Sequence, residues 1–320
     1  MNASQQLQDM QEVIPGLFVG NAQAAENLEL LQTAGITHVL QTADFMSPAF
    51  PDNFTYKVIS IEDMAESNII KYFPETNQFI QDCLDQGGKI LVHCVAGVSR
   101  SVTVVCAYLM KTFNLEPLEA LKQIKAVRFM ANPNHGFFDQ LGLYKEIDFL
   151  VDVKNSSYRR FLMASEAEQM GMMRYVEDMT LGADPEKAKN AAPVVGASKL
   201  KQLRCKRCRR NLVSQDNIVE HISGKGQTAF SYHKRDSEVH FSQVIGADPG
   251  HGHSVCSSYF IEPMEWIAGL ESGCLEGKIL CPKCDAKLGN YCWAGAQCSC
   301  GAWVTPSFTI HRNRVDELNR

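Results

Sequence analysis

The sequence predicts an α/β domain with a mostly parallel central sheet flanked by helices, followed by a small β-rich domain that is dense in cysteine. Strand-like and helix-like segments alternate over the first 150 residues, which is typical of a parallel sheet covered by helices. Nine of the 12 cysteines follow residue 200, and the net charge changes from −8 over residues 1–200 to +3 over residues 201–320. We therefore expect two domains, residues 1–152 and 199–320, joined by a linking helix and a flexible joint over residues 153–198.

Apolar spacing and turn residues mark each element of the first domain. Runs rich in β-branched and aromatic residues predict a strand with a turn over residues 14–20, and further strands over 36–40, 56–61 and 89–92. Helical spacing of apolar residues predicts helices over residues 24–33, 72–86 and 102–110. Gly35 and the Gly87-Gly88 pair end the first two helices. Ligands of such sheets bind at the carboxyl ends of the strands, so the residues after position 92 are candidates for a site.

The stretch His93-Cys94-Val95-Ala96-Gly97-Val98-Ser99-Arg100-Ser101 connects the last predicted strand to an apolar helix. A cysteine and an arginine six positions apart, with a glycine between them and a helix after them, form a cradle for a phosphate group. The substrate-binding N–H groups of this loop belong to Val95, Ala96, Gly97, Val98, Ser99 and Arg100. The Arg100 guanidinium can also bind two phosphate oxygens at once. The same positive field favours the thiolate of Cys94, so one segment holds both nucleophile and substrate.

Residues 93–101 match the HCxxGxSRS signature, and residues 11–150 resemble the cysteine-dependent dual-specificity phosphatases. This resemblance implies a dual-specificity phosphatase fold, with Cys94 as nucleophile and Arg100 stabilising the transition state. It also implies that the Ser101 hydroxyl helps the sulfur to leave. Low-molecular-weight phosphatases carry the loop near the N-terminus, and rhodanese-like sulfur carriers lack the final Arg-Ser pair, so neither fits this chain as well.

A departing phosphoester oxygen needs a general acid from elsewhere in the domain. The loop after the third predicted strand offers Glu62, Asp63 and Glu66. We choose Asp63 because it stands 31 residues before Cys94, the interval at which the resembled family carries its acid. We expect the other two carboxylates to be solvated.

Two other segments are expected to support the phosphate loop. His93 is expected to order it by hydrogen bonding, while the role of Ser99 stays open. Residues 131–141 resemble the family's PNxGFxxQL stretch, which implies that Asn132 and Asn134 fix the loop.

The composition, with 45% hydrophobic and 21% charged residues, is that of a globular chain. The apolar run over residues 102–110 is far shorter than the roughly 20 residues that span a membrane. Residues 1–6 are polar and lack the features of a signal peptide. We therefore expect a reducing compartment, cytoplasm and nucleus, where a cysteine-dense segment favours metal over disulfides or a cluster of metal-free thiols.

Two C-x-x-C knuckles, Cys205/Cys208 and Cys281/Cys284, have the spacing of zinc ligands and predict one closed tetrahedral site. A second structural zinc is predicted on Cys256, Cys298, Cys300 and His311, with His221 or His233 as replacements for the histidine. An alternative joins Cys281 and Cys284 to Cys298 and Cys300. Cys274 and Cys292 match no ligand spacing.

The order of motifs in the second domain is C-x-x-C, then CPKCxxKLG, CSCGxW and IHxxRVD. This order resembles the zinc domain of the dual-specificity protein phosphatase 12 family, and the resemblance covers nearly the whole chain. It implies that the zinc domain binds pre-60S ribosomal particles and promotes release of an assembly factor, a role that need not use the phosphatase. An alternative is therefore a chiefly non-catalytic assembly factor.

A basic run is compatible with ribosomal RNA or ribosomal proteins as partners, besides a phosphoprotein substrate. It holds seven cations and no acid: Lys199, Lys201, Arg204, Lys206, Arg207, Arg209 and Arg210. Arg312, Arg314 and Arg320 follow near the end of the chain. Such a cluster would contact phosphates without reading sequence, although basic runs are commonly only solvated surfaces. Neither DNA nor a membrane is an expected partner.

Overall fold

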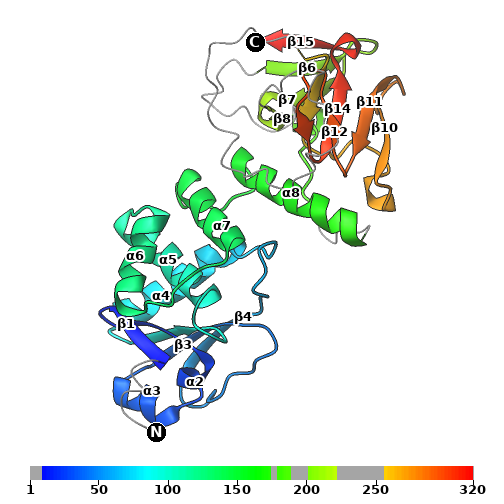
Figure 1. Ribbon diagram of the computed structural model, residues 1–320. Helices are drawn as coiled ribbons and strands as arrows, with labels where there is room; N and C mark the ends of the chain where they lie inside the picture. The colour runs from blue at the N-terminus through cyan, green and yellow to red at the C-terminus, as the bar shows by residue number, and fades with distance from the viewer. Residues whose placement is uncertain (1–8, 174–178, 189–200, 222–255, 320) are drawn as a thin grey trace. The chain divides into compact units, whose positions relative to one another are not determined.

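The computed structural model describes residues 9–173, 179–188, 201–221 and 256–319. The chain forms two compact units, which divide between Tyr158 and Arg159 (Figure 1). The first unit is an α/β body, and the second is built mainly of antiparallel strands.

The central sheet of the first unit is parallel except at one edge. Its strands are β1 (Met10–Ile14), β2 (Leu17–Gly20), β3 (His38–Thr42), β4 (Thr55–Ile59) and β5 (Ile90–His93). They lie in the order β1-β2-β5-β3-β4, with β1 antiparallel to β2 and the other pairs parallel. All of β5 is buried, as expected for the middle strand of a sheet covered on both faces. The predicted fold class is confirmed.

Helices cover both faces of this sheet. They are α2 (Ala22–Ala25), α3 (Leu28–Ala34), α4 (Phe73–Asp85), α5 (Arg100–Phe113), α6 (Pro117–Val127) and α7 (His135–Glu146), with the 3₁₀ turn η1 (Ile70–Tyr72) before α4. Figure 1 shows α2 and α3 on one side of the sheet and α4 to α7 on the other. Helix α5 is buried from Arg100 to Met110, so it lies at the centre of the helical layer. The loop before α5 therefore lies at the carboxyl edge of the sheet.

Two elements of this unit differ from the sequence prediction. The expected strand over residues 14–20 is the turn and second strand of a β hairpin, in which Gly16 has φ +82°. The expected helix over residues 24–33 is interrupted at Asn27. The Asn27 Oδ1 accepts a hydrogen bond from the Leu30 N–H at 3.0 Å and caps the start of a new helix, α3.

The second unit has two antiparallel sheets and a hairpin. Its elements are α8 (Ser156–Met173), α9 (Pro185–Ala188), β6 (Lys201–Cys205), β7 (Asn211–Ser214), β8 (Ile218–Val219), β9 (Ser258–Ile261), β10 (Glu276–Leu280), β11 (Lys287–Cys292), β12 (Ala296–Gln297), β13 (Trp303–Val304), β14 (Ser307–His311) and β15 (Val315–Asn319). The larger sheet has the order β10-β11-β14-β9-β8, the smaller β15-β6-β7, and β12 pairs with β13. This unit is the predicted β-rich region.

Helix α8 places the boundary between the units well before residue 199. Its Ala167 and Met170 are buried in the core of the second unit. Arg159 Nε donates to the Glu262 carboxylate at 2.9 Å. The helix predicted as a connection therefore belongs, from Arg159 onward, to the second unit, because its apolar side chains complete that core. None of the helices in the described ranges combines the length and apolar composition needed to cross a membrane.

Residues 184–198 form the later part of the segment expected to hold the linking helix and the flexible joint, and residues 189–198 lie outside the described residues. Asp184 is buried and pairs with Arg210 at 2.5 Å. Helix α9 lies against β7. For residues 184–188 the expectation of a joint is wrong, because a largely buried ion pair fixes them to the second unit.

Candidate active site and metal centres

Cys94 lies at the base of the loop between β5 and α5 and is 1% exposed. The Gly97 N–H donates to Cys94 Sγ at 3.2 Å, and the Ser101 hydroxyl donates to the same sulfur at 3.4 Å. Both hydrogen bonds stabilise a negatively charged sulfur. The loop thus holds a buried thiol between two donors.

One peptide group of this loop is held from both sides. The Ala96 carbonyl accepts a hydrogen bond from Arg128 Nη2 at 3.1 Å, while the N–H of the same peptide, that of Gly97, donates to Cys94 Sγ. The C=O and N–H of a trans peptide point in opposite directions, so Arg128 aims the N–H at the sulfur. Arg128 Nε also donates to the Gly97 carbonyl at 2.6 Å. Gly97 has φ +68°, a conformation that an L side chain rarely adopts.

Arg128 itself is 2% exposed, and a third hydrogen bond runs from its Nη1 to Gln11 Oε1 at 2.5 Å. Burial lowers the pKa of this guanidinium, and the negative charge of Cys94 acts in the opposite direction. The arginine and the thiolate therefore stabilise each other's charge. No sequence pattern pointed to Arg128, because an arginine just after a helix is commonly a solvated cap.

Arg100, the first residue of α5, is held by a carboxylate that the sequence analysis missed. Its Nη1 donates to Asp44 Oδ1 at 2.6 Å and to the Ile61 carbonyl at 2.9 Å. Its Nε is buried and has no hydrogen-bond partner among the described residues, so this edge remains for a phosphate. Asp44 follows β3 at the carboxyl edge of the sheet, and the strand-end rule could have identified it.

Asp63 lies beside the phosphate loop, as a general acid must. Its Oδ1 accepts hydrogen bonds from the Ser99 hydroxyl at 2.7 Å and from Asn134 Nδ2 at 2.8 Å. Its Oδ2 is 3.6 Å from Arg100 Nε. The Ser99 hydroxyl, whose role the sequence left open, thus ties the acid to the loop. Glu62 and Glu66 are both exposed, as expected, and make no such contact with the loop among the described residues.

Helix α7 and the segment just before it position both the acid loop and the phosphate loop. Gln140 Oε1 accepts from the N–H groups of Ile69 and Ile70 at 2.9 and 3.1 Å, and its Nε2 donates to the Ser67 carbonyl at 2.9 Å. The Asn132 N–H donates to the Val98 carbonyl at 2.8 Å. The PNxGFxxQL-like stretch therefore supports the site through backbone as well as side-chain groups.

His93 is buried, and its Nδ1 lies 3.3 Å from the Cys94 carbonyl oxygen. Burial lowers the pKa of His93 to about 4, against a weaker opposing effect of that carbonyl. The ring is therefore neutral near pH 7 and adds no positive charge beside Cys94.

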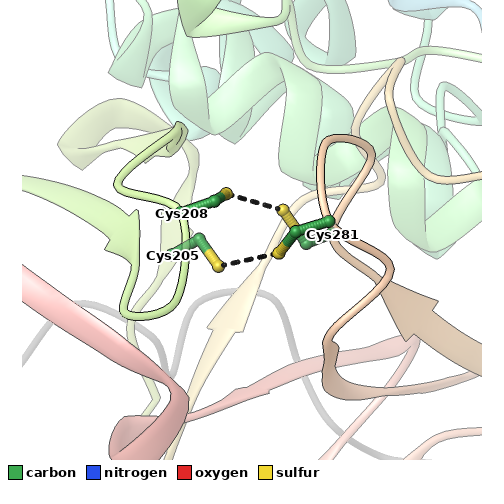
Figure 2. Close-up of side chains that lie close together, drawn as sticks. Cys205, Cys208 and Cys281 are labelled. Carbon is green, nitrogen blue, oxygen red and sulfur yellow. Dashed lines mark hydrogen bonds between the residues drawn. The ribbon is translucent and has the colours of Figure 1, made fainter.

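The two C-x-x-C knuckles meet in space, as the sequence predicts (Figure 2). The sulfurs of Cys205, Cys208, Cys281 and Cys284 all lie within 4.8 Å of one another. The Cys205–Cys284 and Cys208–Cys281 sulfur distances are 3.7 and 3.5 Å. These distances are far too long for a disulfide and close to the roughly 3.8 Å between sulfurs bound to one tetrahedral zinc.

The two knuckles have the same backbone geometry. In the first, the Cys205 carbonyl accepts from the Arg209 N–H at 2.8 Å; in the second, the Cys281 carbonyl accepts from the Asp285 N–H at 2.9 Å. Arg209 and Asp285 both have positive φ. Burial opposes ionisation of Cys208, but the Arg210 N–H and neighbouring thiols outweigh it and lower the pKa of Cys208 to about 7. Burial instead raises the pKa of Cys205, and it raises the pKa of Cys281 to about 12, so Cys208 is the one of these three that favours the thiolate without a metal ion.

A second cluster joins His221, Cys256, Cys298 and Cys300, whose donor atoms also lie within 4.8 Å of one another. The His221 Nε2 is 3.3 Å from Cys300 Sγ and 3.4 Å from Cys256 Sγ. This donor set also fits a tetrahedral metal ion. The prediction of these three cysteines as one group is confirmed, and the alternative that joined Cys298 and Cys300 to the second knuckle is wrong.

The prediction of His311 as the fourth ligand is wrong. β9 lies between β8 and β14, and the β14 register pairs His311 with Ser258, whose Oγ is 3.1 Å from His311 Nδ1. His221 follows β8 on the other side of β9, and its ring packs edge-on against Phe260. The replacement His233 lies outside the described residues.

Half of the described cations of the acid-free basic run are paired with acidic residues distant in sequence. Lys201 pairs with Glu317 at 2.8 Å, Arg209 with Asp316, and Arg210 with Asp184. Lys206 is exposed and forms no ion pair with another described residue. The charge that remains available is therefore smaller than the run suggests.

The chain is similar to phosphatases along nearly its whole length. Residues 17–147 match the family model of the dual specificity phosphatase catalytic domain. Dual specificity protein phosphatase 12 of Rattus norvegicus is 36% identical over 312 residues, covering 96% of this chain and 88% of that protein. Tyrosine-protein phosphatase yvh1 of Schizosaccharomyces pombe is 34% identical over 316 residues, covering 98% and 86%. The crystal structure of human tyrosine phosphatase-like serine/threonine/tyrosine-interacting protein is 41% identical and covers 45% of this chain and 99% of that chain, with a TM-score of 0.43.

Proposed function

Because this chain belongs to the dual specificity protein phosphatase 12 family and is a protein phosphatase, we propose that it hydrolyses phosphotyrosine, phosphoserine and phosphothreonine through a cysteinyl-phosphate at Cys94. The observation that supports this route is the buried Cys94 sulfur, which accepts hydrogen bonds from Gly97 and Ser101 inside an anion-binding loop. The substrates are phosphoproteins.

In the first step the Cys94 thiolate attacks phosphorus, forming a P–S bond while the P–O bond to the amino-acid oxygen breaks. Asp63 gives its proton to that oxygen, which leaves as an alcohol or phenol. The Arg100 guanidinium and the loop N–H groups stabilise the charge on the other phosphoryl oxygens. Asp44 fixes Arg100 Nη1, which leaves the Nε edge to face the substrate.

In the second step the Asp63 carboxylate takes a proton from water as the water oxygen attacks phosphorus. The P–S bond breaks, and the electron pair returns to Cys94 as a thiolate that accepts a hydrogen bond from Ser101. Inorganic phosphate leaves, and Asp63 is again protonated.

Two variants test this mechanism. Cys94→Ser should abolish turnover, and Asp63→Asn should lower kcat on phosphoserine peptides by about 10²–10⁴-fold. The Asp63→Asn loss should be much smaller on an aryl phosphate with a good leaving group, which needs no acid. Measurable turnover by Cys94→Ser, or an equal loss on both substrates, would contradict the assignment.

We also propose that the two Cys/His clusters hold structural Zn²⁺, one ion each. Each cluster supplies four protein donors, so the ion would stabilise the fold and leave no open position for catalysis. Native mass spectrometry should find two zinc ions per chain.

The resemblance to the zinc domain of this family supports a second function. We propose that the second unit binds pre-60S ribosomal particles and promotes release of an assembly factor, in nucleus and cytoplasm, without using the phosphatase. Within the molecule, the separate core of this unit and its two closed clusters fit a binding role better than a catalytic one. Full-length Cys94→Ser protein should still cosediment with pre-60S particles, whereas protein stripped of metal should not. Loss of binding in the metal-loaded Cys94→Ser variant would argue against this proposal.

A further inference from the structure

A hollow of about 440 Å³ lies near the end of β14 in the second unit and has no role in the functions above. It is lined by Ser257, His311, Arg312, Asn313 and Arg314, which we name the terminal pocket. All five side chains carry polar groups, and the three basic ones, of His311, Arg312 and Arg314, present only donors when charged. The lining therefore suits an anion.

Two of its basic side chains have unused donors. His311 is no metal ligand in this fold, and its Nδ1 lies against Ser258, which leaves Nε2 for another partner. Arg312 is fixed by Glu317 at 2.9 Å and by stacking on Tyr259, with its guanidinium carbon 3.9 Å from the ring centroid. Its Nε is nevertheless buried without a hydrogen-bond partner among the described residues.

Cations without an ion pair among the described residues lie both in the pocket and next to it. Arg314 is exposed and forms no ion pair with another described residue. Its carbonyl accepts the Lys206 N–H at 3.0 Å, so exposed Lys206 of the first knuckle is its direct neighbour. Other cations of the basic run, Lys201 and Arg209, are already paired with Glu317 and Asp316. The exposed cations of this pocket and knuckle that form no ion pair with another described residue are thus Arg314, Lys206 and Arg207, of which Arg207 donates to the Cys284 carbonyl at 3.3 Å.

An exposed aromatic ring lies on the hairpin that contacts this pocket. The Ser257 N–H in the pocket wall donates to Ser299 Oγ at 3.0 Å, and Ser299 lies in the β12–β13 hairpin. Trp303 of the same hairpin is 62% exposed. Cations combined with an exposed aromatic ring on a contacting segment are the features by which proteins bind single-stranded nucleic acid, since the cations contact phosphates and the ring stacks on bases.

We propose that the terminal pocket, together with Lys206, binds backbone phosphates of single-stranded RNA, with Trp303 stacking on a base. This inference rests on the proposed binding to pre-60S particles, and it assigns the contact to a particular surface and to RNA. Binding of this kind is independent of sequence and weakens as salt rises.

The test uses full-length, metal-loaded protein and a fluorescein-labelled oligouridylate of about 20 nucleotides, followed by fluorescence anisotropy over a range of salt concentrations. The Lys206→Gln/Arg314→Gln double variant should bind about tenfold more weakly near 0.1 M salt, with a shallower dependence of affinity on salt. Trp303→Ala should weaken binding by about tenfold without changing that dependence. The matched control, Lys122→Gln/Lys125→Gln, makes the same charge change on exposed residues of α6 and should bind as the original chain does. Metal content, measured by native mass spectrometry, should be equal in all four proteins.

Three results would overturn the inference. The first is an unchanged affinity and salt dependence in the double variant. The second is an equal loss in the α6 control, which would mean that only net charge matters. The third is tight binding of poly-glutamate together with an unaffected Trp303→Ala variant, which would identify an acidic protein as the partner. Cosedimentation with pre-60S particles separates this inference from the function on which it rests: if the original chain cosediments and the double variant does too, only the inference fails.

Discussion

Arg128 makes no contact that involves the substrate, yet its replacement should impair catalysis. The Ala96–Gly97 peptide is held by Arg128 Nη2 on its carbonyl side and by Cys94 Sγ on its N–H side. In Arg128→Met the carbonyl is released, and the peptide can rotate so that its N–H no longer points at the sulfur. A hydrogen bond to a charged group contributes about 1.5–3 kcal/mol, so kcat/KM should fall by about 10- to 150-fold.

The same variant should also lose stability. Two loop carbonyls would become unsatisfied in a buried position, and each such group costs about 1–3 kcal/mol. We therefore expect the free energy of unfolding to fall by about 2–6 kcal/mol, measured by urea denaturation. Part of this loss is offset because the guanidinium no longer has to be buried.

Arg128→Lys is the matched control, since it keeps the charge but cannot bridge two carbonyls from a planar fork. It should recover little of kcat/KM on an aryl phosphate substrate. If lysine restores full activity, Arg128 acts through its positive charge and not by orienting the Ala96–Gly97 peptide. If Arg128→Met keeps full activity at a temperature where it is folded, the reasoning about the peptide is wrong.

Three further predictions concern the second unit. His221→Ala should lose one of the two metal ions in native mass spectrometry, whereas His311→Ala should keep both; the reverse result would restore the sequence-based ligand set. Burial raises the pKa of Glu166 to about 7, against the opposing Thr180 N–H at 2.7 Å, so the folded state disfavours the carboxylate. This folded-state pKa lies above that of the unfolded chain, so the free energy of unfolding falls as the pH rises from about 4.5 to about 7. The Glu166→Gln variant has no carboxylate to ionise, so it should be more stable than the original chain by up to about 3 kcal/mol near pH 8. This gain should vanish toward pH 4.5. Urea denaturation over this pH range measures the gain, and a constant gain would contradict it. A fragment of residues 159–320 should unfold at higher urea than one of residues 199–320, because only the longer one keeps Ala167 and Met170 in the core; equal midpoints would contradict the boundary at Arg159.

Residues that act together across long distances in the chain were hard to predict. His221 and His311 both lie beside the start of β9: His221 follows β8, and His311 is the last residue of β14. Which histidine can join the second cluster depends on the side of β9 on which Cys298 and Cys300 lie. The fold of the β12–β13 hairpin sets the position of these two cysteines. The same holds for the basic run, whose partners Asp184, Asp316 and Glu317 are brought to it by α9 and β15.

The sequence by itself determined the features whose parts are contiguous. Residues 93–101 encode strand end, turn, nucleophile and helix start in one segment, and each C-x-x-C knuckle needs only its own turn. Tertiary structure alone decided that Arg128 holds the loop and that His221 completes the second cluster. The physical reason is that contacts within a short segment follow from local backbone geometry, whereas contacts between distant segments depend on strand register and on packing of the whole core.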